Sequence, residues 1–387
     1  MLLNINRYMR VVLLLSDLHM FSPAIYLKFY LITHYNLSTH ICLEDEIYTF
    51  TEDDIVIPFD SKASIECYNH KVKNCLINSP DLYKTLDDKK LCYYFTEKLG
   101  IKNIPTFTYN DFGNKSLTTF VENNKPKNDT FIVKHVDGLA SLKLYTYRSK
   151  ELLKLDNDNF KEFVIQPYLD IKKIITIDCV CKNGKILSCM VEEKNIFYKK
   201  DQFIKYNNNC NRVILTNKDP RYNYVYKHCE MLCKLTNYNG FNELEYIQLT
   251  EDNNAVEDLL LMEINPRMCG VIFTVIKNKS VYIDNVIISY IDAVNPEYIP
   301  SVLKNKDKSK KLIAYNNANK ATIENNYKKA YNFKPSLNNS FIIVGIILLI
   351  IIIIVAIYFG VTKYKLKKGS ETKKLTLGMS KKKFSKK

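Results

Sequence analysis

Three features are missing from this sequence. No glycine-rich phosphate-binding turn follows the first apolar run, Val11 to Leu15. No secretory signal peptide is visible, because that run is only five residues long and meets Asp17. No internal repeat is present. We therefore expect a body that stays in the cytosol, with an N-terminal unit that contributes substrate contacts or structure rather than nucleotide contacts.

A basic domain of the kind that binds nucleic acid is also missing, although the whole chain carries a net charge of +15. Residues 298–387 hold 20 Lys against three acidic residues, which gives +17. Subtraction from 56 basic and 41 acidic residues leaves 36 and 38 for residues 1–297, a charge of −2. Phosphate-backbone binding needs clustered cations on the recognising domain, so we expect no nucleic-acid partner.

The longest apolar run lies near the C-terminus. Residues Phe341 to Val361 contain no charged residue and are long enough to cross the hydrocarbon core as one helix. Because the span comes after the body, we expect a single-pass C-terminal anchor. Nine Lys of residues 298–340 precede the span and eleven follow it, so the positive-inside rule does not settle the orientation.

The 11 cysteines carry no strong metal-binding spacing. Cys179 and Cys181 flank Val180 on a predicted strand, while Cys229 and Cys233 lie one helical turn apart. These four residues allow a zinc site, but buried free thiols, which behave as small hydrophobic side chains, are the interpretation that we favour.

The most informative stretch is Leu259 to Gly270, LLLMEINPRMCG, which predicts a buried strand that ends in polar residues. Side chains alternate along a strand, so Glu263, Asn265 and Arg267 should point the same way. A carboxylate and an amide oxygen are ligands that Mg²⁺ accepts, and a neighbouring guanidinium suits phosphate. The stretch therefore indicates Mg·ATP chemistry.

This stretch resembles the metal-binding strand of ATP-grasp carboxylate–amine ligases, the superfamily of biotin carboxylase, carbamoyl-phosphate synthetase and D-alanine–D-alanine ligase. The resemblance covers residues 80–295, because further family motifs occur upstream in family order. It implies an α/β (α+β) fold in which a half-Rossmann-like unit precedes an ATP-grasp domain. It also implies ATP and Mg²⁺, or Mn²⁺, as cofactors, with small-molecule carboxylate and nucleophile substrates. A homodimer is left open, since many relatives are dimers.

Two upstream motifs resemble phosphate-binding elements of the family. Asp88-Lys89 should begin a helix that ends near Gly100, and the resemblance gives Lys89 to the phosphates. An exposed Lys in the first helical turn is the alternative. The run TFIVKHVDGLAS, residues 130–141, predicts a strand and a loop, where Lys134, Gly138 and Ser141 would bind phosphate and close over it.

The run FVIQPYLD, residues 163–170, resembles the hinge that reads the adenine edge. The matching ATP-binding positions are Gln166, Pro167 and Leu169, and Pro167 keeps the carbonyl that would accept from the adenine amino group. Lys173 stands where the family has a ribose-binding Glu. An ordinary edge strand is the alternative for this run.

A second carboxylate is expected beside Glu263. Asn183-Gly184 predicts a type I′ hairpin turn, and Asp219-Pro220 predicts a helix that ends near Asn237. The strand that follows, residues 242–249, should pair with residues 259–265 so that Glu245 lies next to Glu263. Repulsion between them makes a cation favourable, so we predict Glu245, Glu263 and Asn265 as metal ligands. The resemblance implies that Arg267 is the catalytic residue, which stabilises the acyl phosphate or the transferred phosphoryl group. A solvent-facing Glu245 on an edge strand is the alternative.

These observations divide the chain into consecutive units. We predict a pre-ATP-grasp α/β domain, 1–79, and an ATP-grasp domain, 80–297, with a lid-bearing part (83–165) and a metal-binding part (166–297). A basic linker (298–340), the membrane helix (341–361) and a basic tail (362–387) follow. The short apolar runs 11–15, 40–43 and 55–58 predict strands of the first unit.

Three functions remain compatible with the sequence. The first is a membrane-anchored, Mg·ATP-dependent ligase that joins a carboxylate to an amine or another nucleophile through an acyl phosphate. The second is a membrane-tethered ATP-binding pseudoenzyme or scaffold, favoured by Lys173 and by Lys143, which stands where the lid loop usually has Gly. The third is a purely structural membrane protein, which explains the basic tail but not the body. The intact Glu263 and Asn265 favour the ligase.

Overall fold

The computed structural model describes most of the chain before residue 299, namely residues 10–16, 20–108, 117–136, 144–155, 162–195, 212–268, 280–296 and 298. Within these described ranges, no helix is long and apolar enough to cross a bilayer. The predicted membrane helix at 341–361 and the basic tail lie outside them, as does the linker apart from residue 298. The predicted domain boundaries stay predictions.

The N-terminal unit is a parallel three-stranded sheet with the order β2-β1-β3. Its elements are β1 (Val11–Leu15), α1 (Phe21–Tyr35), β2 (Thr39–Leu43), η2 (Glu44–Thr49), β3 (Ile55–Pro58) and α2 (Ser61–Asn69). All of β1 is buried, because α1 packs on one face of the sheet and α2 on the other. The three predicted strands are confirmed, and β2 begins one residue earlier than expected.

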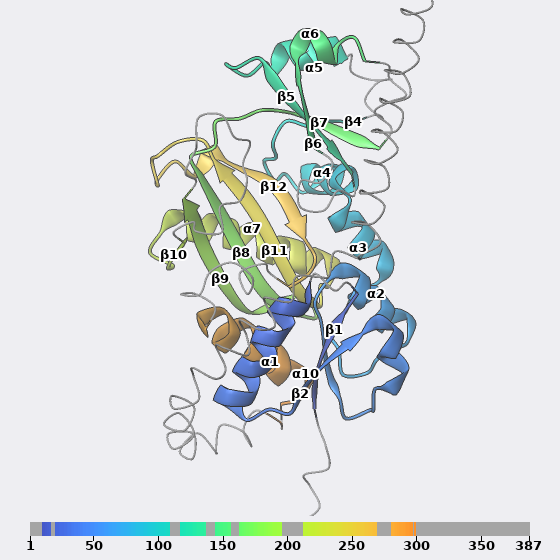
Figure 1. Cartoon of the computed structure of the whole chain (residues 1–387). Helices are drawn as coiled ribbons and strands as arrows, with labels where there is room; N and C mark the ends of the chain where they lie inside the picture. Colours follow the sequence, from blue (N-terminus) through green and yellow to red (C-terminus); the bar gives the residue numbers. More distant parts are fainter. Residues whose placement is uncertain are drawn as a thin grey trace, which may run out of the picture. The chain divides into compact units, whose positions relative to one another are not determined.

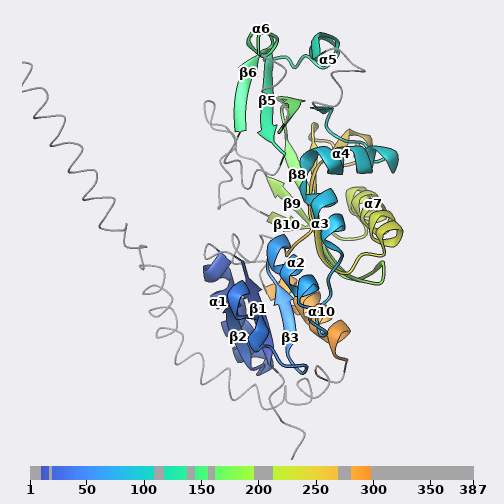
Figure 2. The same cartoon turned by 90° about the vertical axis from the view of Figure 1, so that its right-hand side faces the viewer.

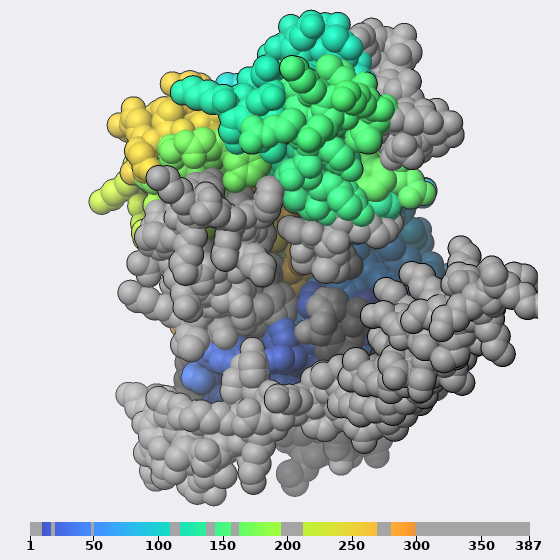
Figure 3. All heavy atoms as spheres, turned by 45° about the horizontal axis from the view of Figure 1, so that its top comes forward, coloured from blue at the N-terminus to red at the C-terminus, as the bar shows by residue number. Residues whose placement is uncertain are grey.

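The second sheet is antiparallel, with the order β4-β7-β5-β6. Its elements are β4 (Phe107–Thr108), α5 (Leu117–Asn123), β5 (Thr130–His135), β6 (Leu144–Arg148), α6 (Ser149–Leu152) and β7 (Phe163–Pro167). Figure 3 shows the side chains of this part, coloured teal to green, as one continuous group. Because β7 lies between two partners, the edge-strand alternative for residues 163–170 is wrong.

The third sheet has five antiparallel strands in the order β10-β9-β8-β11-β12. They are β8 (Lys173–Lys182), β9 (Lys185–Asn195), β10 (Arg212–Ile214), β11 (Gly240–Gln248) and β12 (Leu259–Asn265). Asn183 and Gly184 join β8 to β9 with φ angles of 52° and 73°, which are the two positive values that a type I′ turn requires. The predicted hairpin is therefore confirmed.

Helices complete this part of the fold, and the short terminal elements pack beside the first sheet. They are α3 (Pro80–Asp87), α4 (Lys89–Lys98), α7 (Pro220–Thr236), η5 (Val256–Asp258), η6 (Ile283–Ile287) and α10 (Ile288–Val294). The Asp219 carboxylate accepts from the N–H of Arg221 at the start of α7, and Asn237 ends the helix in the left-handed region. The Asp88 carboxylate caps α4 in the same way, and Gly100 follows the helix at φ 71°. Both predicted helices are confirmed.

The five-stranded sheet has two different faces (Figures 1 and 2). On one face, Leu244 and Tyr246 of β11 pack in the same apolar cluster as Val225 and Leu232 of α7. We call this the α7 face. Side chains alternate along a strand, so Glu243 and Glu245 of β11 point to the opposite face of the sheet. We call that side the carboxylate face.

Candidate functional site

The centre of the candidate site is the pair of strands β11 and β12. Glu245 lies directly opposite Glu263 in the strand register, and Glu243 lies opposite Asn265. The predicted pairing of Glu245 with Glu263 is therefore confirmed. Glu245 is buried on an interior strand, so the alternative of a solvent-facing edge residue is wrong.

Asn265 and Arg267 lie on the same face as Glu263, as strand alternation predicted. The amide of Asn265 donates to Glu243 Oε2 at 3.2 Å and to Glu263 Oε1 at 3.5 Å. Its oxygen Oδ1 accepts from Arg267 Nη2 at 3.2 Å. Asn265 therefore connects two carboxylates to the guanidinium, which places a positive group at the end of the row.

Lys194 on β9 was not anticipated from the sequence, although it is the nearest cation to the carboxylates. Its Nζ lies 2.8 Å from Glu245 Oε1 and 3.8 Å from Glu243 Oε1. All three side chains are buried. The sequence argument assigned the balancing charge to a metal ion alone, whereas the fold supplies an ammonium from two strands away. Glu243 was missed as well, although its alternation with Glu245 could have identified it.

The charges of this group shift the ionisation of its members. Burial, and next the neighbouring Glu245, raises the pKa of Glu243 to about 7. Burial also acts to raise the pKa of Glu245, but the ammonium of Lys194 outweighs it, and the pKa of Glu245 lies below its usual range. The ammonium of Lys194 therefore favours the charged form of Glu245 more than that of Glu243, and Glu245 has the lower pKa.

The two predicted phosphate-binding lysines approach the carboxylates from other elements. The N–H of Lys89, the first residue of α4, donates to the carbonyl of Val136 at the end of β5, 3.0 Å away. Burial lowers the pKa of Lys134; the charges of Glu263 and Glu245 act to raise it and that of Lys89 to lower it. The charges of Glu263, Glu245 and Lys89 therefore all act on the ammonium of Lys134. Lys89 is half-buried, unlike the exposed lysine of the alternative.

The predicted adenine-reading residues lie at the end of β7. The side-chain amide of Gln166 is buried and donates to Thr106 Oγ1 at 2.9 Å. Tyr168 donates its N–H to Thr130 of β5, so the carbonyl of Pro167 points away from that strand. The carbonyl of Leu169 accepts from Ile171. Pro167 thus presents an acceptor of the expected kind, whereas Gln166 is held within the sheet. The predicted loop residues Gly138 and Ser141 lie outside the described residues.

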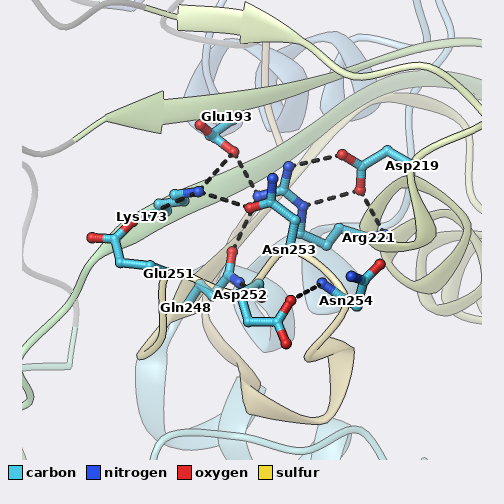
Figure 4. A network of polar contacts seen from close by, with 9 residues as sticks. All are labelled: Lys173, Glu193, Asp219, Arg221, Gln248, Glu251, Asp252, Asn253 and Asn254. Atoms are coloured by element: carbon cyan, nitrogen blue, oxygen red, sulfur yellow. Dashed lines mark hydrogen bonds and ion pairs between the residues drawn. The ribbon is translucent and has the colours of Figure 1, made fainter.

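A second polar network lies at the far end of β8 and contains Lys173 (Figure 4). Its Nζ donates to Asn253 at 2.7 Å and lies 3.7 Å from Glu193 and 3.8 Å from Glu251. The buried Arg221 contacts the same Glu193 at 2.5 Å. This network binds the β11–β12 connection to β8 and α7, and sequence reasoning found only Lys173 among its members.

The donor set of the carboxylate face fits Mg²⁺. Glu243, Glu245 and Glu263 offer carboxylate oxygens, and Asn265 offers an amide oxygen, which are the hard ligands that Mg²⁺ takes. In the described part of the chain these carboxylates do not converge as tightly as a closed metal site, because Lys194 and Asn265 lie among them. That openness suits an ion that is held by one or two carboxylates and by substrate phosphates.

Comparison with known proteins supports the ATP-grasp fold that the sequence predicted. A family model for the ATP-grasp domain matches residues 86–271, and a search of curated proteins finds no match. D-alanyl-alanine synthetase A from Vibrio cholerae O1 has a similar structure, with a TM-score of 0.50 and 10% identity over 76% of this chain and 99% of that chain.

Two further solved structures are similar in fold. The biotin carboxylase domain dimer of 2-oxoglutarate carboxylase from Hydrogenobacter thermophilus, solved with MgADP, ADP and bicarbonate, has a TM-score of 0.50 and 11% identity over 74% of this chain and 70% of that chain. D-alanine–D-alanine ligase from Bacillus anthracis has a TM-score of 0.49 and 13% identity over 78% of this chain and 99% of its own. Residues 86–271 thus match the ATP-grasp domain model, and the predicted α/β fold class is confirmed.

Proposed function

We propose that this protein is an Mg·ATP-dependent ligase that joins a carboxylate to an amine or another nucleophile. The observation that carries the proposal is the register that places Glu245 against Glu263 and Glu243 against Asn265 on one face of the sheet. A cluster of buried carboxylates is costly unless cations pair with it, and here Lys194 and the approaching Lys134 supply positive charge. This arrangement suits a substrate that brings phosphates together with a metal ion.

The residues of the site divide into two groups by charge. Lys89 and Lys134 would hold phosphate oxygens of ATP, and Arg267 would stabilise the phosphoryl group that is transferred. Glu245, Glu263 and Asn265 would hold Mg²⁺, which when bound neutralises charge on the β- and γ-phosphates. Asn265 Oδ1 accepts one hydrogen bond from Arg267, and its second lone pair would serve the ion.

The proposed reaction has two steps. A substrate carboxylate oxygen attacks the γ-phosphorus of ATP, ADP leaves, and an acyl phosphate forms. The nucleophile then attacks the acyl carbon, an amide or equivalent bond forms, and inorganic phosphate leaves with the bonding electrons. The chain's contribution is to align the two substrates and to surround the transferred group with positive charge.

A second candidate is a protein that binds ATP without turnover. Lys173, which replaces the ribose-binding Glu of the family pattern, is already paired with Glu193, Glu251 and Asn253. A side chain committed to protein partners contributes little to ribose recognition. Measured turnover separates this candidate from the ligase.

We also propose that residues 341–361 anchor the protein in a membrane as a single C-terminal span, with the body in the cytosol. The support comes from the sequence alone, which has 21 apolar or small residues without a charge in this interval. Alkaline extraction of membranes tests it: the full chain should stay in the pellet, while a variant with Ile352 and Ile353 changed to Asp should be released. Equal release of both would contradict the anchor.

The nucleotide site is tested by calorimetric titration of the full chain, in detergent, with a non-hydrolysable ATP analogue. Binding should depend on Mg²⁺ and should lose that dependence in Glu263→Gln, which keeps the size of the side chain but removes its charge. Glu230→Gln, an exposed position on α7, is the matched control and should bind like the unchanged chain. Absence of binding with and without Mg²⁺ would overturn both candidates.

Turnover is tested by following ADP release while panels of carboxylates and amines are supplied. ADP release that needs one carboxylate and one nucleophile supports the ligase. Tight Mg·ATP binding without ADP release from any pair supports the second candidate.

A further inference from the structure

Four cysteine side chains meet on the α7 face of the five-stranded sheet, away from the carboxylates. Two belong to β8 and two to α7; the cysteine cluster is Cys179, Cys181, Cys229 and Cys233. All four are at most 1% exposed. The chain spacing gave no strong metal signature because the pairs are about fifty residues apart and meet only when α7 packs on β8.

The local geometry points both pairs at the same place. Cys179 and Cys181 are two residues apart on a strand, so their side chains share one face. Cys229 and Cys233 are four residues apart on a helix, so they lie one above the other on the side that faces the sheet. Two elements thus each supply two sulfurs to one small volume.

Two of three sulfur separations in the cluster are close to those of a thiolate metal site, and the third is shorter. The Sγ–Sγ distances are 3.6 Å for Cys179–Cys181, 3.4 Å for Cys179–Cys229 and 3.1 Å for Cys181–Cys233. Sulfurs bound tetrahedrally to zinc at about 2.3 Å lie about 3.8 Å apart. The sulfurs of Cys179, Cys181 and Cys233 all lie within 4.8 Å of one another, and they form the only such group of three among the described residues. The Cys229 sulfur contacts that of Cys179 at 3.4 Å but lies outside this group, so binding of one ion by all four sulfurs requires the Cys229 side chain to turn toward Cys181 and Cys233.

Van der Waals contact alone does not account for the shortest of these distances. Carbon atoms, which are smaller than sulfur, rest about 3.5–4.0 Å apart at optimal contact. The sulfurs of Cys181 and Cys233 are closer than that, at 3.1 Å. Either a weak S–H···S contact, a shared cation or a bond between the two sulfurs is needed to hold them there.

Asn242 provides a second, independent observation. It lies opposite Cys179 in the register of β11 and β8, and it is 1% exposed. Within the described structure neither its Nδ2 nor its Oδ1 has a hydrogen-bond partner. A buried amide donor beside sulfur atoms is suited to a metal-bound thiolate, which is a strong acceptor.

We propose that the cysteine cluster binds one Zn²⁺ ion as a closed structural site. Four thiols release four protons and bind the ion through four thiolate sulfurs, so the product carries a charge of −2. The Nδ2–H of Asn242 would donate to one of these sulfurs. Because all four coordination positions are taken by sulfur, the ion would bind neither water nor substrate and would take no part in the ligase reaction. It would instead link β8 to α7 on the face of the sheet opposite Glu243 and Glu245.

The test measures metal content and ligand type in the full chain, purified in detergent under reducing conditions. Elemental analysis should find about one zinc per chain, as a closed four-cysteine site requires. After exchange with Co²⁺, the protein should show sulfur-to-cobalt charge-transfer bands and the intense visible bands of a tetrahedral site. The double variant Cys181→Ser/Cys233→Ser should lose the zinc and the bands.

Cys92→Ser is the matched control, since Cys92 is buried in the same apolar cluster but lies outside the cysteine cluster. It should keep the full metal content. If the double variant does not fold, the Co²⁺ spectrum of the unchanged chain decides alone. The proposal is overturned by zinc content that the double variant retains. It is also overturned by an unchanged chain that takes up neither Zn²⁺ nor Co²⁺ through sulfur. That holds whether its four thiols are free or a Cys181–Cys233 disulfide has formed, which mass spectrometry detects as the loss of two hydrogen atoms.

Discussion

The two faces of the five-stranded sheet are made by the same strands and have opposite chemistry. On the carboxylate face, β11 presents Glu243 and Glu245, and β9 presents Lys194. On the α7 face, β11 presents Leu244 and Tyr246. Both faces are buried: around Leu244 and Tyr246 the α7 face is stabilised by removal of apolar surface from water, whereas Glu243, Glu245 and Lys194 compensate one another's charge on the carboxylate face. The comparison indicates that carboxylates suited to binding a cation can be buried when cationic side chains of the protein pair with them.

The largest effect is expected from removing the ammonium that holds the carboxylate face together. Lys194→Met leaves Glu243 and Glu245 buried without their ion-pair partner, and breaking a buried pair costs about 3–5 kcal/mol. Urea unfolding at pH 7 measures this loss. The double variant Lys194→Met/Glu245→Gln should recover part of it. A single variant as stable as the unchanged chain would show that the face does not depend on charge compensation.

The next effect concerns ligand binding rather than stability. Lys134→Met keeps the length and apolar stem of the side chain but removes the charge that approaches Glu263 and Glu245. If Lys134 holds ATP phosphates, turnover should fall about 10²–10³-fold, the loss typical of a charge-stabilising group. Steady-state ADP release measures this, and circular dichroism checks the fold. Unchanged turnover would remove Lys134 from the site.

A truncation on the opposite face sharpens the comparison. Leu232 is fully buried between α7 and the sheet. Leu232→Ala should cost about 2–4 kcal/mol through lost apolar burial and a residual cavity. Mg²⁺-dependent nucleotide binding should stay unchanged below the unfolding transition, because no charge on the carboxylate face is altered. A matched loss of binding by calorimetry would show that the two faces are energetically coupled.

The smallest effect is expected at the start of α7, and it depends on pH. The Arg221 side chain holds the pKa of Asp219 below its usual range, although partial burial opposes this shift. A carboxylate with a lowered folded pKa stabilises the protein above its unfolded pKa of about 3.9, and this contribution is lost as pH falls through the folded value. Asp219→Asn should therefore be less stable than the unchanged chain from pH 5 to 8.

The stability difference between the two chains should shrink as the pH falls below about 4. Thermal unfolding across this range is the measurement. A difference that grows toward acid would contradict the ion pair of Asp219 with Arg221.

Local signals in the sequence were sufficient for much of the site. The pairing of Glu245 with Glu263 was predicted from two apolar strands joined by an acidic connection. An irregularity between Glu245 and Tyr246 shifts the ladder by one residue and brings the two carboxylates opposite each other, which the sequence did not show. Asn183-Gly184 predicted its turn, since those residues accept positive φ. Asp88 predicted the start of α4, because its carboxylate caps free N–H groups.

Contacts between distant segments could not be predicted in the same way. Lys194 on β9 contacts Glu245 on β11 across the intervening strand β8. Arg221 on α7 contacts Glu193 on β9 and Gln248 on β11, although α7 separates these two strands in the sequence. No short-range pattern encodes such pairs, because strand order and helix placement decide them. Gln166 is a further example: the side-chain amide donates to Thr106, next to β4, a contact that its position in the motif did not predict.

The sequence by itself determined the order of strands and helices, the hairpin turns, the helix caps and the acidic residues that share the end of β12, because each depends on neighbours a few residues away. Only the tertiary structure decided that Lys194 would balance Glu245 and that the four sulfurs of the cysteine cluster would meet. The physical reason is that burial acts on whole faces of a sheet and brings together side chains that the chain itself keeps far apart.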